Sequence, residues 1–365
     1  MNPYSTDKAL LHADRLRELK DGRQPNPVHL QLILSDLCNH DCAWCAYRMS
    51  GYTSNQLFGI TDPDGTYHHN PNRMIPTGKV MEILADFAGM GGKAVQFTGG
   101  GEPTVHPDCA PIIHAANAMG LDTSIVTNGQ NLNRSVRAAL VNSTWVRVSI
   151  DAGTVETYAP MRRVKASVWK TVHENVRALV DLRNRTGSKL YIGVSFIVSK
   201  ENWREILLGA EVAKSLGVDS IRYAAVFNPE GIRYYDGFLD EARSLCKEAT
   251  KGSTETFKVI DNFGVRSADL DLGNPDYDMC AYQHLTTYIG ADLNLYRCCV
   301  LAYNERGLVG SLKDQRLPAL WRSVHKQADF AALDPKKCER CQFNDRNRQI
   351  QKIIEQLPGE HGNFV

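Results

Sequence analysis

The chain has 365 residues, 43% of them hydrophobic, and a formal net charge of +1 at pH 7. This length suits one large domain, or a large and a small one, and the hydrophobic content excludes disorder as the main state. The near-neutral charge, without a basic or acidic block, gives no indication of a nucleic-acid or membrane partner. Residues 1–24 are polar and helical in pattern rather than a signal peptide, so we expect a cytoplasmic protein. Ten cysteines in such a protein indicate metal or redox chemistry rather than disulfides.

Strand-like and helix-like segments alternate from residue 29 onward. The strand-like runs are 29–36, 94–100, 122–129, 145–151, 189–199 and 220–228. The helix-like segments between them are 77–90, 107–120, 133–142, 167–184 and 202–217. Because parallel strands need crossover helices, this alternation predicts an α/β fold, a partial (β/α)6 barrel of the TIM type. Functional groups on such a sheet should collect at the carboxyl ends of the strands.

The pattern changes after residue 229, where a small α+β module rich in cysteine is expected. A helix at 237–250 and a strand at 256–260 precede two strands around a turn within 284–300. A short helix at 317–325 and a terminal helix follow. The predicted divisions are an N-terminal helical extension (1–28), the barrel core (29–229), a connecting segment (230–269) and the C-terminal module (270–365).

Three thiols, Cys38, Cys42 and Cys45, stand on one short loop after the first strand. Thiolates are soft ligands that suit zinc or an iron–sulfur cluster. A structural zinc site needs four protein ligands, so His40 would have to join the three cysteines. Three thiolates can instead hold three irons of a four-iron cubane and leave the fourth iron open.

This C-x3-C-x2-C spacing, with Trp44 before the last cysteine, resembles the radical S-adenosylmethionine (SAM) superfamily. The resemblance implies a [4Fe-4S] cluster with an open iron site, and SAM as cofactor. It further implies that the reduced cluster cleaves SAM to methionine and a 5′-deoxyadenosyl radical, which removes a hydrogen atom from a substrate carbon.

Several other residues match cofactor-binding positions of that family. The implied set is Trp44, Gly99, Gly100, Gly101, Glu102, Thr127, Asn128, Ser149, Asp151 and Arg162. The glycines would let backbone groups approach the methionine amine, where a Cβ would clash. Each position also has an ordinary structural alternative: a glycine or "NG" turn, a helix cap at Asp151, or an exposed arginine at 162.

The polar span 48–76 directly follows the cysteine loop and is long and irregular enough to act as a lid over the cavity. Its candidates for substrate contact are Tyr52, Tyr67, His68 and His69. A solvated surface insertion is the alternative.

A second cysteine set lies in the C-terminal module and consists of Cys280, Cys298, Cys338 and Cys341. Its spacing resembles the auxiliary-cluster extension of the twitch or SPASM-like type, which implies a second [4Fe-4S] cluster with four thiolate ligands. The family pattern has glycine five residues before the second cysteine. This chain has Leu293 there, so an altered turn is expected. A structural zinc site with the same four ligands is the alternative.

The remaining thiols belong to Cys109, Cys246 and Cys299. Cys109 is expected in the core. Cys299 adjoins Cys298, which leaves the ligand ambiguous, and we choose Cys298. Cys246, which also suits a core position, and Cys299 are the candidates for a catalytic thiol that returns a hydrogen atom to a substrate radical, as in an epimerase.

The resemblance therefore implies a radical SAM oxidoreductase or epimerase. We expect a small polar substrate, a sugar or aminocyclitol, that is dehydrogenated or epimerised. The alternative is radical modification of a peptide, as in maturases of ribosomal peptides, or of a residue within another polymer. The expected partners are the substrate and an electron donor such as flavodoxin or ferredoxin.

Overall fold

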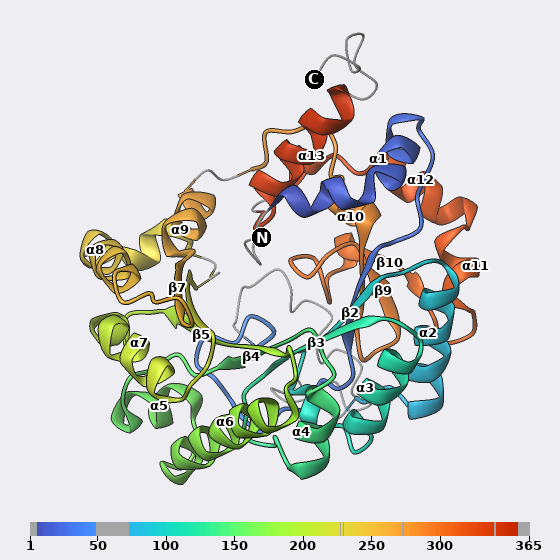
Figure 1. The fold of residues 1–365 in the computed structure, drawn as a ribbon. Coiled ribbons are helices and arrows are strands. Elements are labelled where there is room, and N and C mark those ends of the chain that lie inside the picture. The colour runs from blue at the N-terminus through green and yellow to red at the C-terminus, as the bar shows by residue number, and fades with distance from the viewer. Residues whose placement is uncertain are drawn as a thin grey trace, which may run out of the picture.

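The computed structural model describes residues 6–48, 73–226, 228, 230–271, 274–338 and 341–356. The strands within these ranges form one sheet in the order β10-β9-β8-β1-β2-β3-β4-β5-β6-β7. Their bounds are β1 His29–Ile33, β2 Ala94–Thr98, β3 Asp122–Thr127, β4 Trp145–Ser149, β5 Tyr191–Val198, β6 Ser220–Ala225, β7 Lys258–Asp261, β8 Thr286–Ile289, β9 Asn294–Tyr296 and β10 Leu308–Ser311. The sheet is curved, and its strands follow one another along an arc (Figure 1).

Helices cover the outer side of this sheet (Figure 1). Their bounds are α1 Ala13–Lys20, α2 Thr77–Gly89, α3 Cys109–Ala118, α4 Arg134–Leu140, α5 Val155–Arg162, α6 Ser167–Thr186, α7 Ile206–Ser215, α8 Leu239–Thr250, α9 Phe263–Asp271, α10 Tyr282–Leu285, α11 Leu317–Trp321, α12 Val324–Ala332 and α13 Asn344–Gln356. Short 3-10 helices include η1 Thr6–His12 and η3 Pro103–Val105. Over the described ranges, none of the helices is both long enough and apolar enough to cross a membrane.

The strands β1 to β7 run parallel to their neighbours, which confirms the predicted α/β partial barrel. The parallel run continues one strand beyond the six expected, since β7 pairs with β6. At the other edge β8 pairs in parallel with β1, and the antiparallel strands β9 and β10 follow. The predicted C-terminal strands thus extend the barrel sheet. The short strand β10 was not predicted from the sequence.

Local sequence explains where the helices of the barrel begin and end. The side chain of Asn133 accepts a hydrogen bond from the Val136 N–H (3.0 Å) and caps the start of α4. The side chain of Thr154 does the same for α5 by accepting from the Thr157 N–H (3.3 Å). The long helix α6 stops at Gly187, whose φ of +64° is in the left-handed region that glycine favours.

The N-terminal helix packs against the last helix of the chain rather than against the barrel helices. Leu16 and Leu19 of α1 share a small hydrophobic cluster with Ile350 and Ile354 of α13. Figure 1 shows these two helices side by side.

A buried carboxylate joins the barrel to the C-terminal segment. Asp86 of α2 is 8% exposed and accepts hydrogen bonds from the Arg316 guanidinium and from the Leu317 N–H (3.2 Å) at the start of α11. Glu82, one turn earlier on the same helix, reaches the same arginine at 3.6 Å but is more exposed. The contact of Asp86 with Arg316 is therefore buried, whereas the contact of Glu82 with the same arginine is solvated.

We predict that Asp86→Ala lowers the free energy of unfolding by about 1–3 kcal/mol, because the Leu317 N–H and the arginine lose their acceptor. Glu82→Ala is the matched control and should change it by less than about 1 kcal/mol. Urea unfolding followed by circular dichroism measures both. Equal losses in the two variants would contradict the burial argument.

Candidate active site

The cysteine loop follows β1, and polar donors surround its three half-buried thiols. The Sγ atom of Cys38 accepts from the His40 N–H at 3.4 Å. The Sγ atom of Cys42 accepts from the Arg162 guanidinium at 3.6 Å, and that of Cys45 from the Arg48 guanidinium at 3.9 Å. N–H donors and cations at this range stabilise the charged form of a thiol.

These thiols fit an iron–sulfur cluster by the chemistry of the donor set. Burial, together with the charge of Glu102, raises the pKa of Cys38 to about 12, and burial raises the pKa of Cys42. A thiol that coordinates metal is deprotonated outright, so the surrounding donors would then face thiolates. Within the described ranges, no three His, Cys, Asp or Glu side chains are grouped so that they could share a single metal ion.

His40, the fourth ligand of the alternative zinc site, is buried and occupied by another contact. Its Nε2 atom is hydrogen-bonded to Gln130 Oε1 at 2.9 Å. Burial lowers the pKa of the imidazole to about 4. The imidazole of His40 therefore packs beside the cysteine loop and is held by Gln130, which argues against its role as a zinc ligand.

The glycine triplet lies directly against the cysteine loop. A Cβ on Gly100 would lie 2.2 Å from Asp36 Oδ1, and one on Gly101 would lie 2.1 Å from the Leu37 carbonyl oxygen. The Gly101 N–H donates to the Ser35 carbonyl (2.9 Å). Glycine is therefore required here for contact with the loop backbone, a reason that the sequence did not reveal. Methionine binding by Gly99, Gly100 and Gly101 stays a prediction.

Glu102 ties the ends of β2 and β3 together. Its carboxylate accepts hydrogen bonds from the Thr127 hydroxyl (2.6 Å), the Asn128 N–H (2.7 Å) and the Thr104 hydroxyl (2.7 Å). Burial raises its pKa, and these donors oppose that shift. The Asn128 amide in turn donates to Asn39 on the cysteine loop (2.6 Å). The side chain of Glu102 thus positions Thr127 and Asn128 beside the loop.

Asp151 and Arg162 form a buried ion pair, and neither takes its ordinary structural alternative. Arg162 is 4% exposed and also donates to the Ser149 carbonyl at 2.7 Å. Asp151 has a φ of +59° and accepts from the Ile197 N–H at 2.8 Å, while Thr154 caps the next helix. An exposed Arg162 and a capping Asp151 are therefore both wrong as alternatives. The pair fixes the carboxyl end of β4 beside the cysteine loop.

Trp44, between the second and third cysteines, contributes an aromatic face to this cluster. Its ring lies 5.7 Å from the Arg162 guanidinium carbon, and the ring of Tyr158 lies at the same distance. The Arg162 Nε atom has no hydrogen-bond partner among the described residues. The arginine is thus held beside the Cys42 thiol with one buried donor unused.

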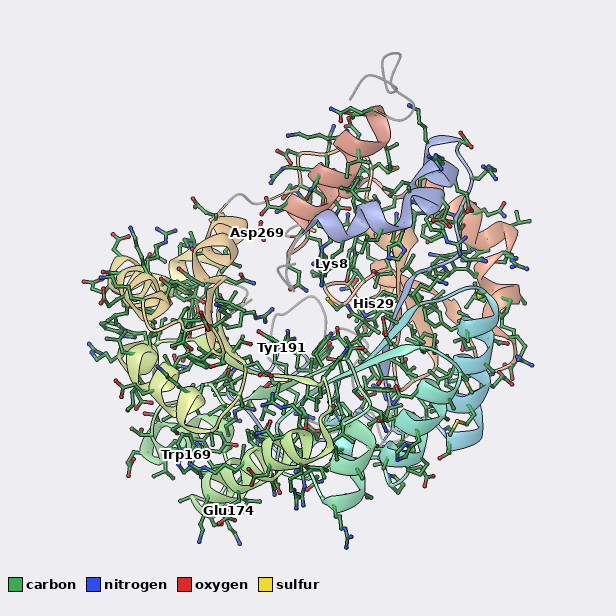
Figure 2. The ribbon with its side chains drawn as sticks, viewed as in Figure 1. Lys8, His29, Trp169, Glu174, Tyr191 and Asp269 are labelled. Atoms are coloured by element: carbon green, nitrogen blue, oxygen red, sulfur yellow. The ribbon has the colours of Figure 1, made fainter. Side chains whose placement is uncertain are left out.

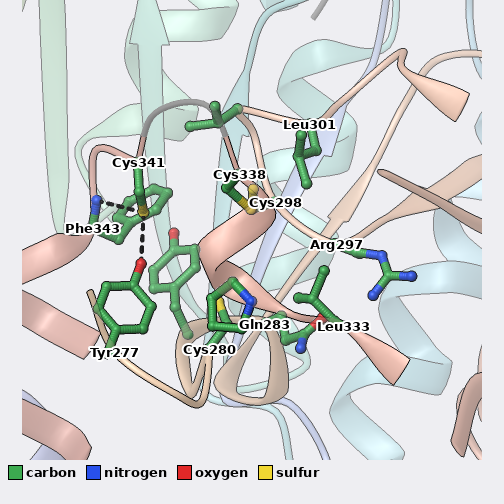
Figure 3. A pocket seen from close by; sticks show the side chains of 13 residues that line it. Tyr277, Cys280, Gln283, Arg297, Cys298, Leu301, Leu333, Cys338, Cys341 and Phe343 are labelled. Carbon is green, nitrogen blue, oxygen red and sulfur yellow. Dashed lines mark hydrogen bonds between the residues drawn. The ribbon is translucent and has the colours of Figure 1, made fainter. Parts of the chain in front are cut away.

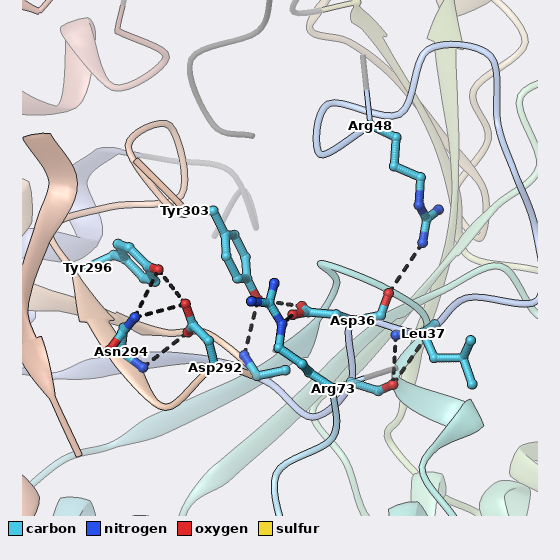
Figure 4. Close-up of polar contacts among 10 residues, drawn as sticks. Asp36, Leu37, Arg48, Arg73, Asp292, Asn294, Tyr296 and Tyr303 are labelled. Atoms are coloured by element: carbon cyan, nitrogen blue, oxygen red, sulfur yellow. Dashed lines mark hydrogen bonds and ion pairs between the residues drawn. The ribbon is translucent and has the colours of Figure 1, made fainter. Parts of the chain in front are cut away.

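A second buried network connects the loop to the C-terminal strands (Figure 4). Asp36, two residues before Cys38, accepts from the Tyr303 hydroxyl and from Arg73 Nε at 2.8 Å. Tyr303 also accepts from the Ala291 N–H at 3.0 Å and has a φ of +54°. Burial raises the pKa of Asp36 to about 7 against the opposing effect of Arg73. Sequence reasoning missed this network, because no local pattern pairs residues so far apart.

The second cysteine set is brought together. Cys280, Cys298, Cys338 and Cys341 all line one small cavity, whose other walls include Tyr277 and Phe343 (Figure 3). Residues 339–340 lie outside the described ranges.

Polar groups donate to two of these sulfur atoms. Cys341 Sγ accepts from the Tyr277 hydroxyl (3.1 Å) and the Phe343 N–H (3.2 Å). Cys280 Sγ accepts from the Asn347 amide at 3.8 Å. Burial raises the pKa of all four thiols. Four soft ligands around one enclosed space fit a cluster with no open iron.

The three other cysteines have separate surroundings. Cys299 is half-buried, and its Sγ atom accepts from the Gln342 amide at 2.8 Å. Cys109, at the start of α3, is in the core as expected. Cys246 of α8 is 0% exposed within the main hydrophobic core, and burial raises the pKa of its thiol. A hydrogen donor must face the substrate, so this position argues against Cys246 in that role.

Leu293 forms the turn between β8 and β9 with a φ of +65°. Its N–H donates to the Gly290 carbonyl at 3.0 Å. Leu293 is thus a non-glycine residue in the left-handed region, which a glycine would adopt at lower energy. The expectation of a turn that differs from the family pattern stays a prediction.

The proposed lid candidates Tyr52, Tyr67, His68 and His69 lie outside the described residues. Of the span 48–76, only 48 and 73–76 are described. The lid and the predicted domain divisions stay predictions.

The parallel sheet and the cysteine loop after β1 agree with a radical SAM domain. Residues 32–207, just under half of the chain, match the model of the Radical SAM superfamily. The chain therefore carries a radical SAM domain, and that family uses a [4Fe-4S] cluster together with SAM. The cysteine-rich C-terminal region is consistent with an auxiliary cluster.

Curated relatives match only part of this chain. A tungsten-containing aldehyde ferredoxin oxidoreductase cofactor-modifying protein of Pyrococcus furiosus is 30% identical over 156 residues, 40% of this chain and 43% of that protein. A probable GTP 3′,8-cyclase of Saccharolobus islandicus is 24% identical over 194 residues, 53% of this chain and 54% of that protein. The chain thus spans about half of these relatives or less.

Solved structures share the fold over nearly the whole chain. The structure of Streptococcus suis SuiB bound to the precursor peptide SuiA has a TM-score of 0.62 at 16% identity, and covers 91% of this chain and 73% of that chain. The structure of anSMEcpe with bound AdoMet has a TM-score of 0.56 at 14% identity. The matched region covers 89% of this chain and 95% of anSMEcpe.

We predict that Cys298→Ala loses the iron of the second set, whereas Cys299→Ala keeps it. Only Cys298 lines the cavity with the other three thiols, so only its removal deletes a ligand. Iron content and electron paramagnetic resonance of anaerobically reconstituted protein measure the difference. If Cys299→Ala loses the cluster and Cys298→Ala keeps it, the assignment of the adjacent thiols is reversed.

Proposed function

We propose that this protein is a radical SAM oxidoreductase that dehydrogenates a small polar substrate, a sugar or aminocyclitol. The observation that carries the proposal is the pair of thiol sites: three donor-surrounded thiols after β1, and four thiols around one cavity in the C-terminal region. When bound, the first cluster and SAM supply a 5′-deoxyadenosyl radical, which takes one hydrogen atom from a substrate carbon.

Dehydrogenation leaves one proton and one electron to be removed from the substrate radical. An electron acceptor close to the substrate is therefore needed. Cys280, Cys298, Cys338 and Cys341 would hold an auxiliary cluster whose chemistry is to accept that electron. The Asp36–Tyr303 hydrogen bond supports this role, because it joins the cysteine loop to the segment that carries the second set.

Epimerisation has less support than dehydrogenation. It needs a thiol that faces the substrate radical and returns a hydrogen atom. Cys246 is fully buried in the core, and Cys299 is engaged by Gln342. Neither thiol has the free position that the reaction requires.

A peptide substrate is the second candidate. It is supported by the similarity over 91% of this chain to SuiB, whose structure contains a precursor peptide. Incubating the reduced enzyme with SAM and either sugars and aminocyclitols or peptides distinguishes the two. The class that stimulates formation of 5′-deoxyadenosine above the background is the substrate class.

We predict that the reconstituted chain holds about eight irons and reductively cleaves SAM, whereas the triple variant Cys38/Cys42/Cys45→Ala holds about four and does not. The variant removes every protein ligand of the first cluster and leaves the second set intact. Iron analysis and chromatographic detection of 5′-deoxyadenosine provide the readouts. A variant that still cleaves SAM would refute the proposed function.

We also predict that Cys246→Ala retains substrate turnover within about twofold, since its thiol is buried behind the sheet rather than at the site. The product formed in heavy water should gain no deuterium at the oxidised carbon. One deuterium at an inverted carbon, lost in Cys246→Ala, would instead establish epimerisation with this cysteine as donor.

A further inference from the structure

The inner face of the sheet carries two arginines that the proposed chemistry does not use. Successive side chains of a strand point to opposite faces. Val146 of β4 is buried in the core beneath the helices, so Arg147 points to the inner face. Tyr223 of β6 donates its hydroxyl hydrogen to the Ile206 carbonyl of α7 at 2.6 Å, so its neighbour Arg222 also points inward. Both arginines are half-buried.

The register brings these arginines toward each other across β5. Arg147 pairs with Gly193, and Arg222 pairs with Ser195, so the two Cα atoms are roughly 12 Å apart by strand geometry. Between them the inner face of β5 presents only a glycine and a serine. Next to Gly193 lie Ser220 Oγ, 2.9 Å from the place of a Cβ, and a ring carbon of Tyr191 at 4.0 Å. Two long side chains can therefore converge on one group beside these small and polar neighbours. Figure 2 shows Tyr191, at the start of β5, on this inner side and Glu174 of α6 on the outer side.

Arg147 has no counter-ion among the described residues. Its guanidinium takes part in no hydrogen bond or ion pair there, and its one ring contact is with Trp145, at 5.5 Å from the centroid. The side chain of Gln96, on the inner face of β2, also makes no hydrogen bond to the described residues. A half-buried cation without a partner is costly to desolvate unless an anion binds to it.

The carboxylates nearest to this face are already engaged. Asp151 is paired with Arg162 and lies within electrostatic reach of Arg222. Glu102 accepts from Thr127 and from backbone at the ends of β2 and β3. None of these carboxylates pairs with Arg147, so the positive charge of Arg147 is not neutralised by the described residues.

We propose that Arg147 and Arg222 form a subsite for an anionic group of the substrate, a phosphate or a carboxylate. This inference rests on the proposed function and names its substrate class, an anionic small molecule rather than a neutral polyol. Guanidinium groups match both anions through paired N–H donors. Ser149 ends β4 two residues beyond Arg147, so the anion binds one layer below the rim where SAM is expected, and the reacting carbon points to that rim.

The test uses calorimetric titration of the anaerobically reconstituted, SAM-loaded protein with pyrophosphate, with citrate and with neutral glycerol. The first two probes separate phosphate from carboxylate recognition. We expect one or both anions to bind, and glycerol not to bind. Arg147→Gln should raise the dissociation constant of the anion by about tenfold or more, because a hydrogen bond to a charged group is lost. Arg147→Lys should retain part of the affinity, and added salt should weaken binding to the parent.

Arg134→Gln, which removes an exposed arginine at the start of α4, is the matched control and should bind the anion like the parent. Circular dichroism and SAM cleavage without substrate verify that Arg147→Gln is folded and loaded. Equal anion affinity in Arg147→Gln and the parent, or no anion binding at all, would overturn the subsite. If the anion result is negative but the parent still cleaves SAM, only the subsite is refuted and the proposed function is retained. If the parent does not cleave SAM, the proposed function is refuted, whatever the titration shows.

Discussion

Close packing of the glycine triplet against the cysteine loop is the constraint on which the rest of the site depends. Gly100 and Gly101 leave no room for a Cβ beside Asp36 and Leu37, so the loop after β1 is fixed on the end of β2. Asp36 is then held from the other side by Tyr303 and Arg73. The three thiols are therefore presented by a loop that is packed on both sides, as a cluster with an open coordination position requires.

The strand β1 and the cysteine loop also contact the C-terminal segment of the chain. β8 adds to the edge of β1, and the segment after β9 supplies both Tyr303 and a thiol of the second set. The site proposed for the radical and the site proposed for the electron acceptor thus lie on one continuous sheet and its connections. Burial of charged groups at this junction is compensated by pairing, since Asp36 and Asp151 each have an arginine partner. Arg147 on the inner face differs, because no carboxylate among the described residues pairs with it.

Local patterns revealed most of the framework. The alternation of apolar residues placed β1 to β6 and the helices between them, and the cysteine spacing identified both thiol sets. Element boundaries, the pairing of β7 with β6 and the short strand β10 were less accessible, since each depends on contact with a distant strand. Leu293 is an example: the left-handed backbone that it adopts is fixed by the hydrogen bond to Gly290 and by the strands on either side, and no local pattern predicts it for a leucine.

The sequence alone thus determined the fold class, because it follows from periodicity, and the cysteine spacing carried the resemblance from which the class of chemistry and the proposed ligands were inferred. Tertiary structure decided which side chains meet: Cys298 rather than Cys299 at the cavity, Cys246 inside the core, and Arg162 buried on Asp151. It also showed that Glu102 binds the ends of two strands and that Arg147 and Arg222 share one face. Such contacts join residues far apart in the chain, and only the packing of the whole sheet determines their distance and their burial.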